Sequence, residues 1–512
     1  MIVKPATPDR SGAATTSRIA LAVLLASLVL GLLGDVLLRA TPWGLNAVLW
    51  IAALALSIGA ITQWRAVDLR GGGRWLIGPA VVFAAGLAWR DSFTLQACNF
   101  LAVLIALALV AYRARSGQVR VAGLVDYVAA LIVAGVNACF GALSLVFGDV
   151  QWSALTAGRE RSRQVVAVST GLLIALPLLM VFGGLLTSAD AVFQSIVENL
   201  FNWDIDQLMS HAFTIGVWSW LVAGFLRQTL LAKEVSPAAT SATTFSLGAV
   251  EIGTALGALN VLFFAFVLVQ FRYFFGGAEA IRTTINLTYS EYARRGFFEL
   301  VQVAALALPT LLFAHHLLKK DNPAGVRAFN ALAAITIGLL FIIMFSAVTR
   351  MKLYTDEFGL TELRLYTTAF MGWLALVFVW FGATVLRGQR SRFIFGGLIA
   401  GFAILLGLNA LNPDALIVRT NAARVTAPNP LDAEYMSELS ADSVPALIET
   451  LPSLAEADRC AVAERVLRRW APPESFDPLT WNWSRAQAWQ IVGANQAYLQ
   501  SIACPASDSL MD

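Results

Sequence analysis

One stretch of the sequence, residues 328–349, decides the fold class: it reads AFNALAAITIGLLFIIMFSAVT and contains no charged residue. A helix rises 1.5 Å per residue, so a helix of this length reaches about 33 Å and can cross the roughly 30 Å of hydrocarbon in a bilayer. Inside lipid, the backbone must satisfy its own hydrogen bonds, which favours a helix over a strand. The stretch therefore predicts a membrane-spanning helix.

Similar apolar stretches recur throughout the 512-residue chain. Of the residues, 58% are hydrophobic and only 13% are charged, whereas soluble domains have about 25% charged residues. This composition excludes a soluble globular enzyme and predicts an all-α polytopic transmembrane helix bundle of about 11–13 membrane helices. The clear candidates for spans are residues 19–38, 43–62, 75–90, 95–112, 165–186, 208–230, 251–273, 297–317, 328–349, 366–386 and 393–411.

The positions of Lys and Arg predict the orientation of the chain. If the N-terminus is cytoplasmic, the cytoplasmic segments hold twenty Lys and Arg residues and the outer segments hold nine. Short cytoplasmic loops are the ones that retain positive charge. We therefore expect a cytoplasmic N-terminus and an extracytoplasmic C-terminal region. That region, residues 413–512, is acidic, with seven basic and thirteen acidic residues.

Residues 121–148 do not fit this scheme as a single crossing, because the Arg clusters on both sides of the segment belong in the cytoplasm. We expect either a re-entrant or interfacial hairpin broken near Gly135-Val136-Asn137, or two short helices that extend to about residue 157. The predicted domains are an N-terminal four-helix segment (1–120), this ambiguous segment (121–164), a seven-helix core (165–411) and a helical cap (412–512).

The last hundred residues have a different pattern from the rest of the chain. Prolines and helix-capping residues follow Asn412, and apolar residues recur at helical spacing, which predicts a small helical domain. It either packs only for stability or covers a ligand site. Cys460 and Cys504 both lie in it, and an oxidising compartment would allow a disulfide between them. The alternative is two free thiols.

Polar residues gather at the outer ends of the spans between residues 251 and 386. If residues 287–300 are helical, Glu291, Arg295 and Glu299 form a charge ladder on one face. Ionisable groups in spans usually face protein or a water-filled cavity, so they are functional candidates. The alternative is that the ladder only forms salt bridges that hold the helix in place. The outer Arg residues would then pair either with the acidic tail or with an anionic headgroup or ligand. The candidates are Gln270, Arg272, Tyr273, Tyr289, Glu291, Tyr292, Arg294, Arg295, Glu299, Arg350, Tyr354 and Arg364.

Motifs for familiar chemistry are missing from the sequence. It has no phosphate-binding GxxxxGK[ST], no HExxH, no G-x-S-x-G and no kinase motif set. Three histidines without Cys/His spacing predict no metal site, and we expect no cofactor. The scattered Arg residues form no nucleic-acid-binding face. We assign no catalytic residue and favour the interpretation that the protein is not an enzyme.

Several strings in the chain resemble a known family. They include QFRYFFGG (270–277), TYSEYARRGFFEL (288–300), RMKLY (350–354) and LSADSVPAL (439–447). These strings resemble the bacterial multi-pass membrane family called domain of unknown function 4173, and the matching motifs lie between about residues 165 and 450. The resemblance implies a protein of the bacterial cytoplasmic (inner) membrane, with no established activity and no catalytic residue.

Two functions from different classes fit these observations. The first is transport or handling of a small molecule or lipid through an outward-facing Arg/Tyr/Glu site. The alternative is a membrane scaffold or signalling partner that binds another envelope protein through its outer loops and cap. A third, an envelope-modifying transferase, has the least support. The expected partners are membrane lipids and either an envelope protein or a small anionic ligand, but not nucleic acid.

Overall fold

The structure is a computed structural model that describes residues 10–64, 74–116, 124–150, 205–231, 246–285, 297–319, 323–424 and 432–504, with short pieces between 168 and 193. Over these ranges it is helical, and its one β-type pairing is an isolated bridge between Leu247 and Leu318. Ten of the described helices are long and apolar enough to span a membrane. The expected all-α polytopic bundle is confirmed.

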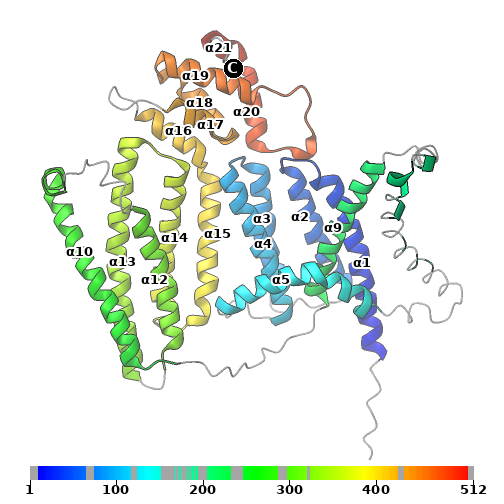
Figure 1. The fold of residues 1–512 in the computed structure, drawn as a ribbon, viewed down its shortest axis with the longest axis horizontal. Coiled ribbons are helices and arrows are strands. Elements are labelled where there is room, and N and C mark those ends of the chain that lie inside the picture. The colour runs from blue at the N-terminus through cyan, green and yellow to red at the C-terminus, as the bar shows by residue number, and fades with distance from the viewer. Residues whose placement is uncertain are drawn as a thin grey trace, which may run out of the picture. The chain divides into compact units, whose positions relative to one another are not determined.

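The membrane helices follow most of the predicted stretches (Figure 1). The apolar part of α3, Ile77–Trp89, is shorter than a full span, and the stretch predicted at 165–186 lies mostly outside the described residues. The helices are α1 (Arg10–Leu38), α2 (Leu45–Trp64), α3 (Arg74–Trp89), α4 (Phe93–Ser116), α5 (Leu124–Ser144), α9 (Ile205–Leu230), α10 (Ala249–Ile285), α12 (Phe297–Leu317), α13 (Pro323–Phe358), α14 (Glu362–Thr384) and α15 (Phe393–Leu411).

Helix α5 differs from the expected hairpin. It continues without a break through residues 135–137 and then passes into a π-helical turn, η2 (Leu145–Asp149). A single glycine costs a helix only about 1 kcal/mol relative to alanine, and the neighbouring Ala, Leu and Val residues have no proline among them to interrupt the backbone hydrogen bonds. The number of crossings in this region and the domain boundaries at 120, 164 and 411 stay predictions.

The contacts divide the chain into two compact units. Unit 1 comprises residues 1–81, 104–117 and 127–235. In it, α1 packs along α9 through small residues, and a Cβ atom added to Gly34 would lie 2.8 Å from the Trp218 ring. Helix α5 meets α9 where a Cβ atom on Gly141 would lie 2.9 Å from the Gly224 Cα. Small residues therefore allow both close helix contacts.

Unit 2 comprises residues 82–103, 118–126 and 236–512. Its membrane core contains α10, α12, α13, α14 and α15, with buried side chains such as Leu340 and Phe378 between the helices. Polar side chains also link these helices. The Asn260 carboxamide accepts a hydrogen bond from Thr336 (2.7 Å), which joins α10 to α13, and Trp373 on α14 donates to the Gly397 carbonyl on α15 (3.0 Å).

The C-terminal part of unit 2 is a small helical domain that we call the cap, residues 413–504. Asn412 separates α15 from the cap in a left-handed conformation (φ 55°), and its side chain accepts from the Ala415 amide, so the chain turns sharply there. Figure 1 shows the cap beyond the ends of α13, α14 and α15. Its main helices are α16 (Pro413–Ala423), α17 (Ala433–Glu438), α18 (Val444–Thr450), α19 (Glu456–Trp470), α20 (Trp483–Ala494) and α21 (Gln496–Ile502).

Candidate functional site

A buried polar cluster joins the cap to the turn between α3 and α4. At its centre is Asp442, which is 2% exposed. Its carboxylate accepts from the backbone amides of Asp91 (2.7 Å) and Ser92 (2.8 Å) and from Arg90 Nη1 (3.2 Å). A buried carboxylate needs such donors to offset its lost hydration. We call the cluster the junction; it contains Arg90, Asp91, Ser92, Asn409, Asp442, Asn482 and Ser484.

The junction also satisfies carbonyl groups at helix ends, which have no partner within their own helix. Asn482 is the N-cap of α20: its Oδ1 accepts from the Arg485 amide (3.1 Å). Its Nδ2 donates to the carbonyls of Leu87 and Arg90, each at 2.9 Å. Arg90 Nε donates to the Asn409 carbonyl at the end of α15 (2.6 Å). The junction therefore fixes the ends of α3, α15 and α20 to one another.

Two acidic residues, Asp91 in the junction and Asp414 beside it in α16, have raised pKa values. Burial raises the pKa of Asp91 to about 6, although Arg485 Nε lies 3.4 Å away. Burial also raises the pKa of Asp414 to about 6, against the opposing hydrogen bonds from Ser440 to Oδ2. Among the residues that the structure describes, no donor reaches Asp414 Oδ1. Both carboxyl groups therefore keep their proton to a higher pH than an exposed aspartate does.

The structure brings two of the predicted candidates together inside the membrane part of unit 2. The Gln270 side-chain oxygen on α10 accepts from Arg350 Nη2 (2.8 Å) and from Ser346 Oγ (3.0 Å), both on α13. Gln270 is 4% and Arg350 9% exposed. A guanidinium in this position needs an acceptor, and the carboxamide provides one within the protein.

A second pair of candidates lies at the turn between α13 and α14. The Arg364 guanidinium stacks over the Tyr354 ring at 4.1 Å, a cation–π contact, and it donates to the Phe358 and Gly359 carbonyls. Gly359 has a φ of 79°, which glycine adopts without strain. Arg364 therefore stabilises the turn between α13 and α14.

The other predicted candidates cannot be placed in a site. Arg272 and Tyr273 belong to α10, but their side chains are outside the described part of the molecule, as are all atoms of Tyr289, Glu291, Tyr292, Arg294 and Arg295. Glu299 lies exposed in the first turn of α12. The ladder of Glu291, Arg295 and Glu299 stays a prediction.

Within the described part of the chain, one Arg of the membrane part forms an ion pair with the acidic C-terminal region, and it is not one of the predicted candidates. Arg90 pairs with Asp442 of the cap, whereas Arg350 and Arg364 use Gln270, an aromatic ring and backbone carbonyls. A basic residue of the cap also bonds to a membrane helix. Arg424 Nη1 donates to the carbonyls of Asp356 and Glu357 at the end of α13, each at 3.0 Å. Positive charge at a helix C-terminus is stabilising.

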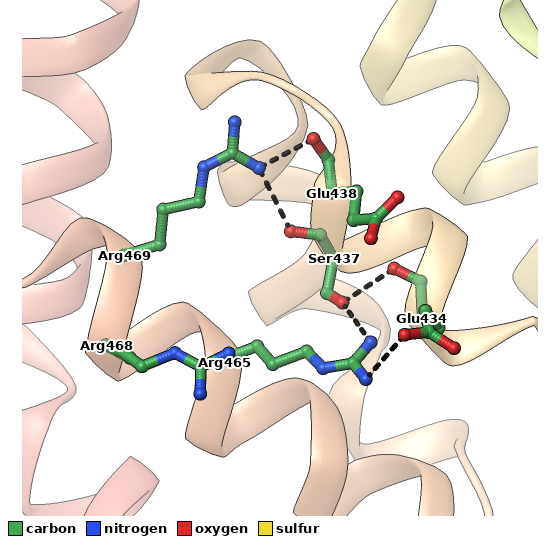
Figure 2. Close-up of a pocket in the computed structure, with 6 residues that line it drawn as sticks. All are labelled: Glu434, Ser437, Glu438, Arg465, Arg468 and Arg469. Atoms are coloured by element: carbon green, nitrogen blue, oxygen red, sulfur yellow. Dashed lines mark hydrogen bonds and ion pairs between the residues drawn. The ribbon is translucent and has the colours of Figure 1, made fainter. Parts of the chain in front are cut away.

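A polar pocket lies between α17 and α19 of the cap (Figure 2). Its volume is about 420 Å³. Arg465 donates to Ser437 Oγ (3.1 Å) and Glu434 (3.2 Å), and Arg469 donates to the Glu438 carbonyl (2.6 Å), so these two side chains hold α17 in place. The residues that line it are Glu434, Ser437, Glu438, Arg465, Arg468 and Arg469.

Arg468 differs from its two neighbours in the pocket. It pairs within its own helix, with Glu464 at 3.2 Å, and its side chain is 70% exposed. The remaining guanidinium N–H groups of an Arg in such a position can donate to a carboxylate of another molecule. Among the described residues, no group of three His, Cys, Asp or Glu side chains is arranged to hold a metal ion.

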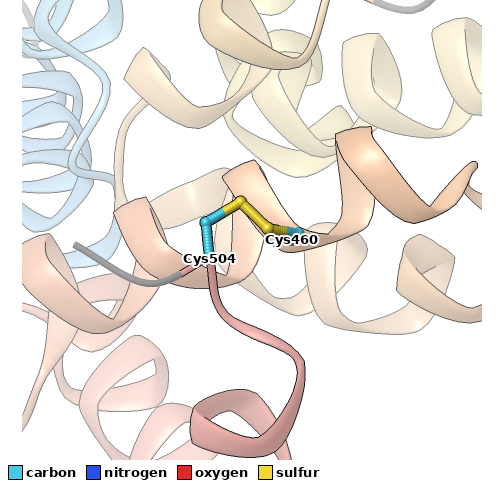
Figure 3. The surroundings of a disulfide bond; sticks show 2 residues. All are labelled: Cys460 and Cys504. Atoms are coloured by element: carbon cyan, nitrogen blue, oxygen red, sulfur yellow. A yellow bond between two sulfur atoms is a disulfide. The ribbon is translucent and has the colours of Figure 1, made fainter. Parts of the chain in front are cut away.

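A disulfide joins Cys460 in α19 to Cys504 after α21 (Figure 3). The two Cα atoms are 4.9 Å apart, within the usual range for a disulfide. The bond closes a loop that contains α20 and α21. This is the cysteine pair that the sequence singles out.

The junction was not predicted as a site. Arg90 and Asp91 are a charged pair in an otherwise apolar stretch, and Asp442 lies within the string LSADSVPAL, so the sequence contained both halves of the signal. The missing information was the contact between them, across 352 positions.

These features define an all-α, multi-pass membrane protein with a C-terminal helical cap. Residues 77–450 match the family model described as Domain of unknown function (DUF4153). The match covers more than half of the chain, so the chain belongs to this family. An uncharacterised family is confirmed, but the family number predicted from the motifs, 4173, is wrong, and the match begins in α3, well before residue 165. No curated protein and no solved structure matches the chain.

Proposed function

We propose that this multi-pass membrane protein is a scaffold of the bacterial inner membrane whose cap binds another envelope protein. The observation that carries the proposal is the Arg/Glu pocket of about 420 Å³ between α17 and α19. Both signs of charge line it. A peptide offers carboxylates for the Arg side chains and amide donors for the Glu side chains, whereas an inorganic anion satisfies only the Arg side chains.

Two further observations support this proposal. The junction holds the cap to the helix ends through a buried Asp442–Arg90 pair and the Asn482 hydrogen bonds, so the pocket is presented on a fixed support. The Cys460–Cys504 disulfide is typical of an oxidising compartment, in agreement with an extracytoplasmic cap.

Arg468→Glu tests the proposal, with Arg419→Glu as the matched control. Both residues form exposed ion pairs, which contribute about 0–1 kcal/mol each, so both variants should fold. Of Arg468 and Arg419, only Arg468 lines the pocket. A photo-crosslinking residue in place of the exposed Glu438 would report binding in living cells.

We expect a discrete protein adduct that persists in Arg419→Glu and is lost in Arg468→Glu. The proposal is overturned if the crosslinker captures only lipid, captures nothing, or captures the same protein in both variants at equal yield.

A second candidate function, handling of a small molecule or lipid through the outer Arg/Tyr/Glu residues, rests on the buried Gln270–Arg350 contact. Polar groups inside spans are costly and often mark a ligand path. Neutralising Arg272, Arg295 or Glu299 should then change the lipid or metabolite profile of the cell at an unchanged protein level. Loss of these variants from the membrane would instead assign the charges to stability.

A further inference from the structure

The turn that joins α14 to α15, residues 385–392, carries three arginines: Arg387, Arg390 and Arg392. Its backbone is ordered, because the amides of Arg387 and Gln389 donate to the Thr384 carbonyl (3.2 and 2.8 Å) and Gly388 adopts a positive φ of 79°. Both flanking helices are long and apolar enough to span a membrane. A turn this short between two spans lies at the membrane surface, beside the lipid headgroups. We call it the arginine turn.

Two neighbouring helices of unit 2 hold the arginine turn in place. Asn330 Nδ2 on α13 donates to the Leu386 carbonyl (3.1 Å). Arg390 Nη1 and Nη2 both lie 3.3 Å from Nδ1 of His316 on α12. A guanidinium can only donate, so the His316 nitrogen accepts. The ends of α12 and α13 therefore help to fix where the arginines lie.

The arginine turn differs from the cap in how its positive charges are compensated. Several arginines of the cap pair with glutamates: Arg419, Arg465 and Arg468. Across the described ranges, no carboxylate pairs with the arginines of the turn; Arg390 contacts an imidazole, and Arg392 Nη1 donates to the Gln389 carboxamide (3.3 Å). Arg387 and Arg392 are exposed and Arg390 is half-buried. The turn therefore offers three guanidinium groups to an anion at the membrane surface.

An apolar track leads away from the arginine turn along α14. Leu376, Val379 and Trp380 are 50%, 59% and 38% exposed, and their spacing of three and four residues places them on one face of the helix. Trp380 is the end of the track nearest the turn: its Nε1 donates to the Arg392 carbonyl (3.3 Å), and Gly396 on α15 leaves room for its ring. Tryptophan is typical of the membrane–water interface. The surface is therefore cationic at the headgroups and apolar beside them.

We propose that the arginine turn binds the phosphate of an anionic phospholipid, whose acyl chains pack along the apolar track of α14. Forked guanidinium donors match the oxygens of a phosphodiester, and clusters of arginine at the membrane surface attract anionic headgroups. Free phosphate or an acidic peptide would contact the arginines alone, whereas a lipid contacts both parts of the surface. The site is separate from the cap and does not depend on the proposed protein partner.

Native mass spectrometry of the full chain in detergent tests the proposal, because it resolves the binding of single lipids. The probes are phosphatidylglycerol and phosphatidylcholine with identical acyl chains. We expect the unchanged protein to prefer phosphatidylglycerol, and we expect Arg392→Gln to weaken that binding by about tenfold and Arg390→Gln/Arg392→Gln to weaken it further. Binding of phosphatidylcholine should not change. The matched control, Arg419→Gln, removes the same charge from an exposed position of the cap and should leave the preference intact.

Equal affinities of the unchanged protein for the two lipids would overturn the proposal, and the arginines would then serve only to orient the chain. An equal loss in Arg419→Gln would overturn it as well, and so would displacement of phosphatidylglycerol by an excess of inorganic phosphate, which would indicate a site for the free anion. If the double variant fails to insert, Arg392→Gln alone decides, and an unchanged affinity for phosphatidylglycerol refutes the site.

Discussion

At the residue scale, this protein uses its buried charges to connect segments that are distant in sequence. Asp442 in the cap bonds to the turn at residues 90–92, and Gln270 bonds to Arg350 on another helix. The sequence predicted that Gln270, Arg350, Tyr354 and Arg364 would be polar candidates at the outer ends of spans. It could not predict their partners, because a partner is determined by packing and not by spacing along the chain.

Asp442→Ala should destabilise the attachment of the cap by about 3 to 5 kcal/mol, because Arg90 would stay buried without its carboxylate. Hydrogen exchange of α20 in the full chain in nanodiscs measures this loss. Glu449→Ala is the control: its pair with Arg419 is exposed on both sides, so it should cost at most about 1 kcal/mol. Equal effects of the two variants would contradict a junction that depends on burial.

The buried Asp414 carboxyl group should make the stability of the fold depend on pH. Its folded-state pKa of about 6 lies above the ordinary value of 3.8, so folding favours the protonated form. Its contribution to stability is therefore fully present below about pH 4 and is lost as the pH rises through 6. Asp91, with a pKa raised to about 6, acts in the same direction.

Asp414→Asn imitates the protonated carboxyl group and should stabilise α16 at pH 7.5 by on the order of 2 kcal/mol. Exchange protection of α16, corrected for intrinsic rates, should then vary less between pH 5 and 7.5 than in the unchanged protein. A variant that is less stable at both pH values would show that the ionised form is the one that the fold needs.

At the element scale, apolar length predicted the helices well and their ends less well. Helices α12 and α15 coincide closely with the predicted stretches, whereas α10 and α13 continue past them into polar sequence. Hydropathy reports where a helix is apolar, and a helix does not have to end where it leaves the apolar layer. The continuity of α5 shows the same limit, because a glycine is a weak signal for a break.

The glycines of α5 provide a test of the helix packing. Gly141→Ala would place a methyl group against the Gly224 backbone, which cannot yield as a flexible side chain can, and should cost about 1 to 3 kcal/mol. Gly135→Ala meets nothing within 4 Å and should be neutral or stabilising by up to about 1 kcal/mol. Thermal unfolding of the full chain in nanodiscs compares them, and an equal effect of both would argue against the contact with α9.

At the scale of the whole molecule, the orientation connects the cap, its disulfide and its proposed partner. The charge distribution predicts that the cap is extracytoplasmic. An enzyme reporter that is active only outside the cytosol should therefore work when it is fused after the cap and should be silent when it is fused after Gln118. A silent reporter on an intact, inserted cap fusion would reverse the orientation.

The disulfide gives a second prediction at this scale. It closes a loop of 44 residues, which corresponds to about 4 kcal/mol in the loop-entropy model and typically 2–4 kcal/mol in measurements. Cys460→Ser should lower the free energy of unfolding of the cap by about 2 to 4 kcal/mol, measured by hydrogen exchange of α19. Treatment of the unchanged protein with a reductant should reproduce the effect and should leave the variant unaffected.

The junction also has a consequence for biosynthesis. Asn482 follows Leu87 by 395 positions. At about 5 to 20 residues per second, the ribosome needs roughly 20 to 80 s to add the partner of a carbonyl that has already been inserted. During this interval the nascent chain displays Arg90 and the end of α3 without their acceptors and donors, and membrane chaperones and proteases have access to them. We expect a translation product that stops before residue 482 to keep the Leu87 and Arg90 carbonyls without this donor and to be degraded faster than the complete chain.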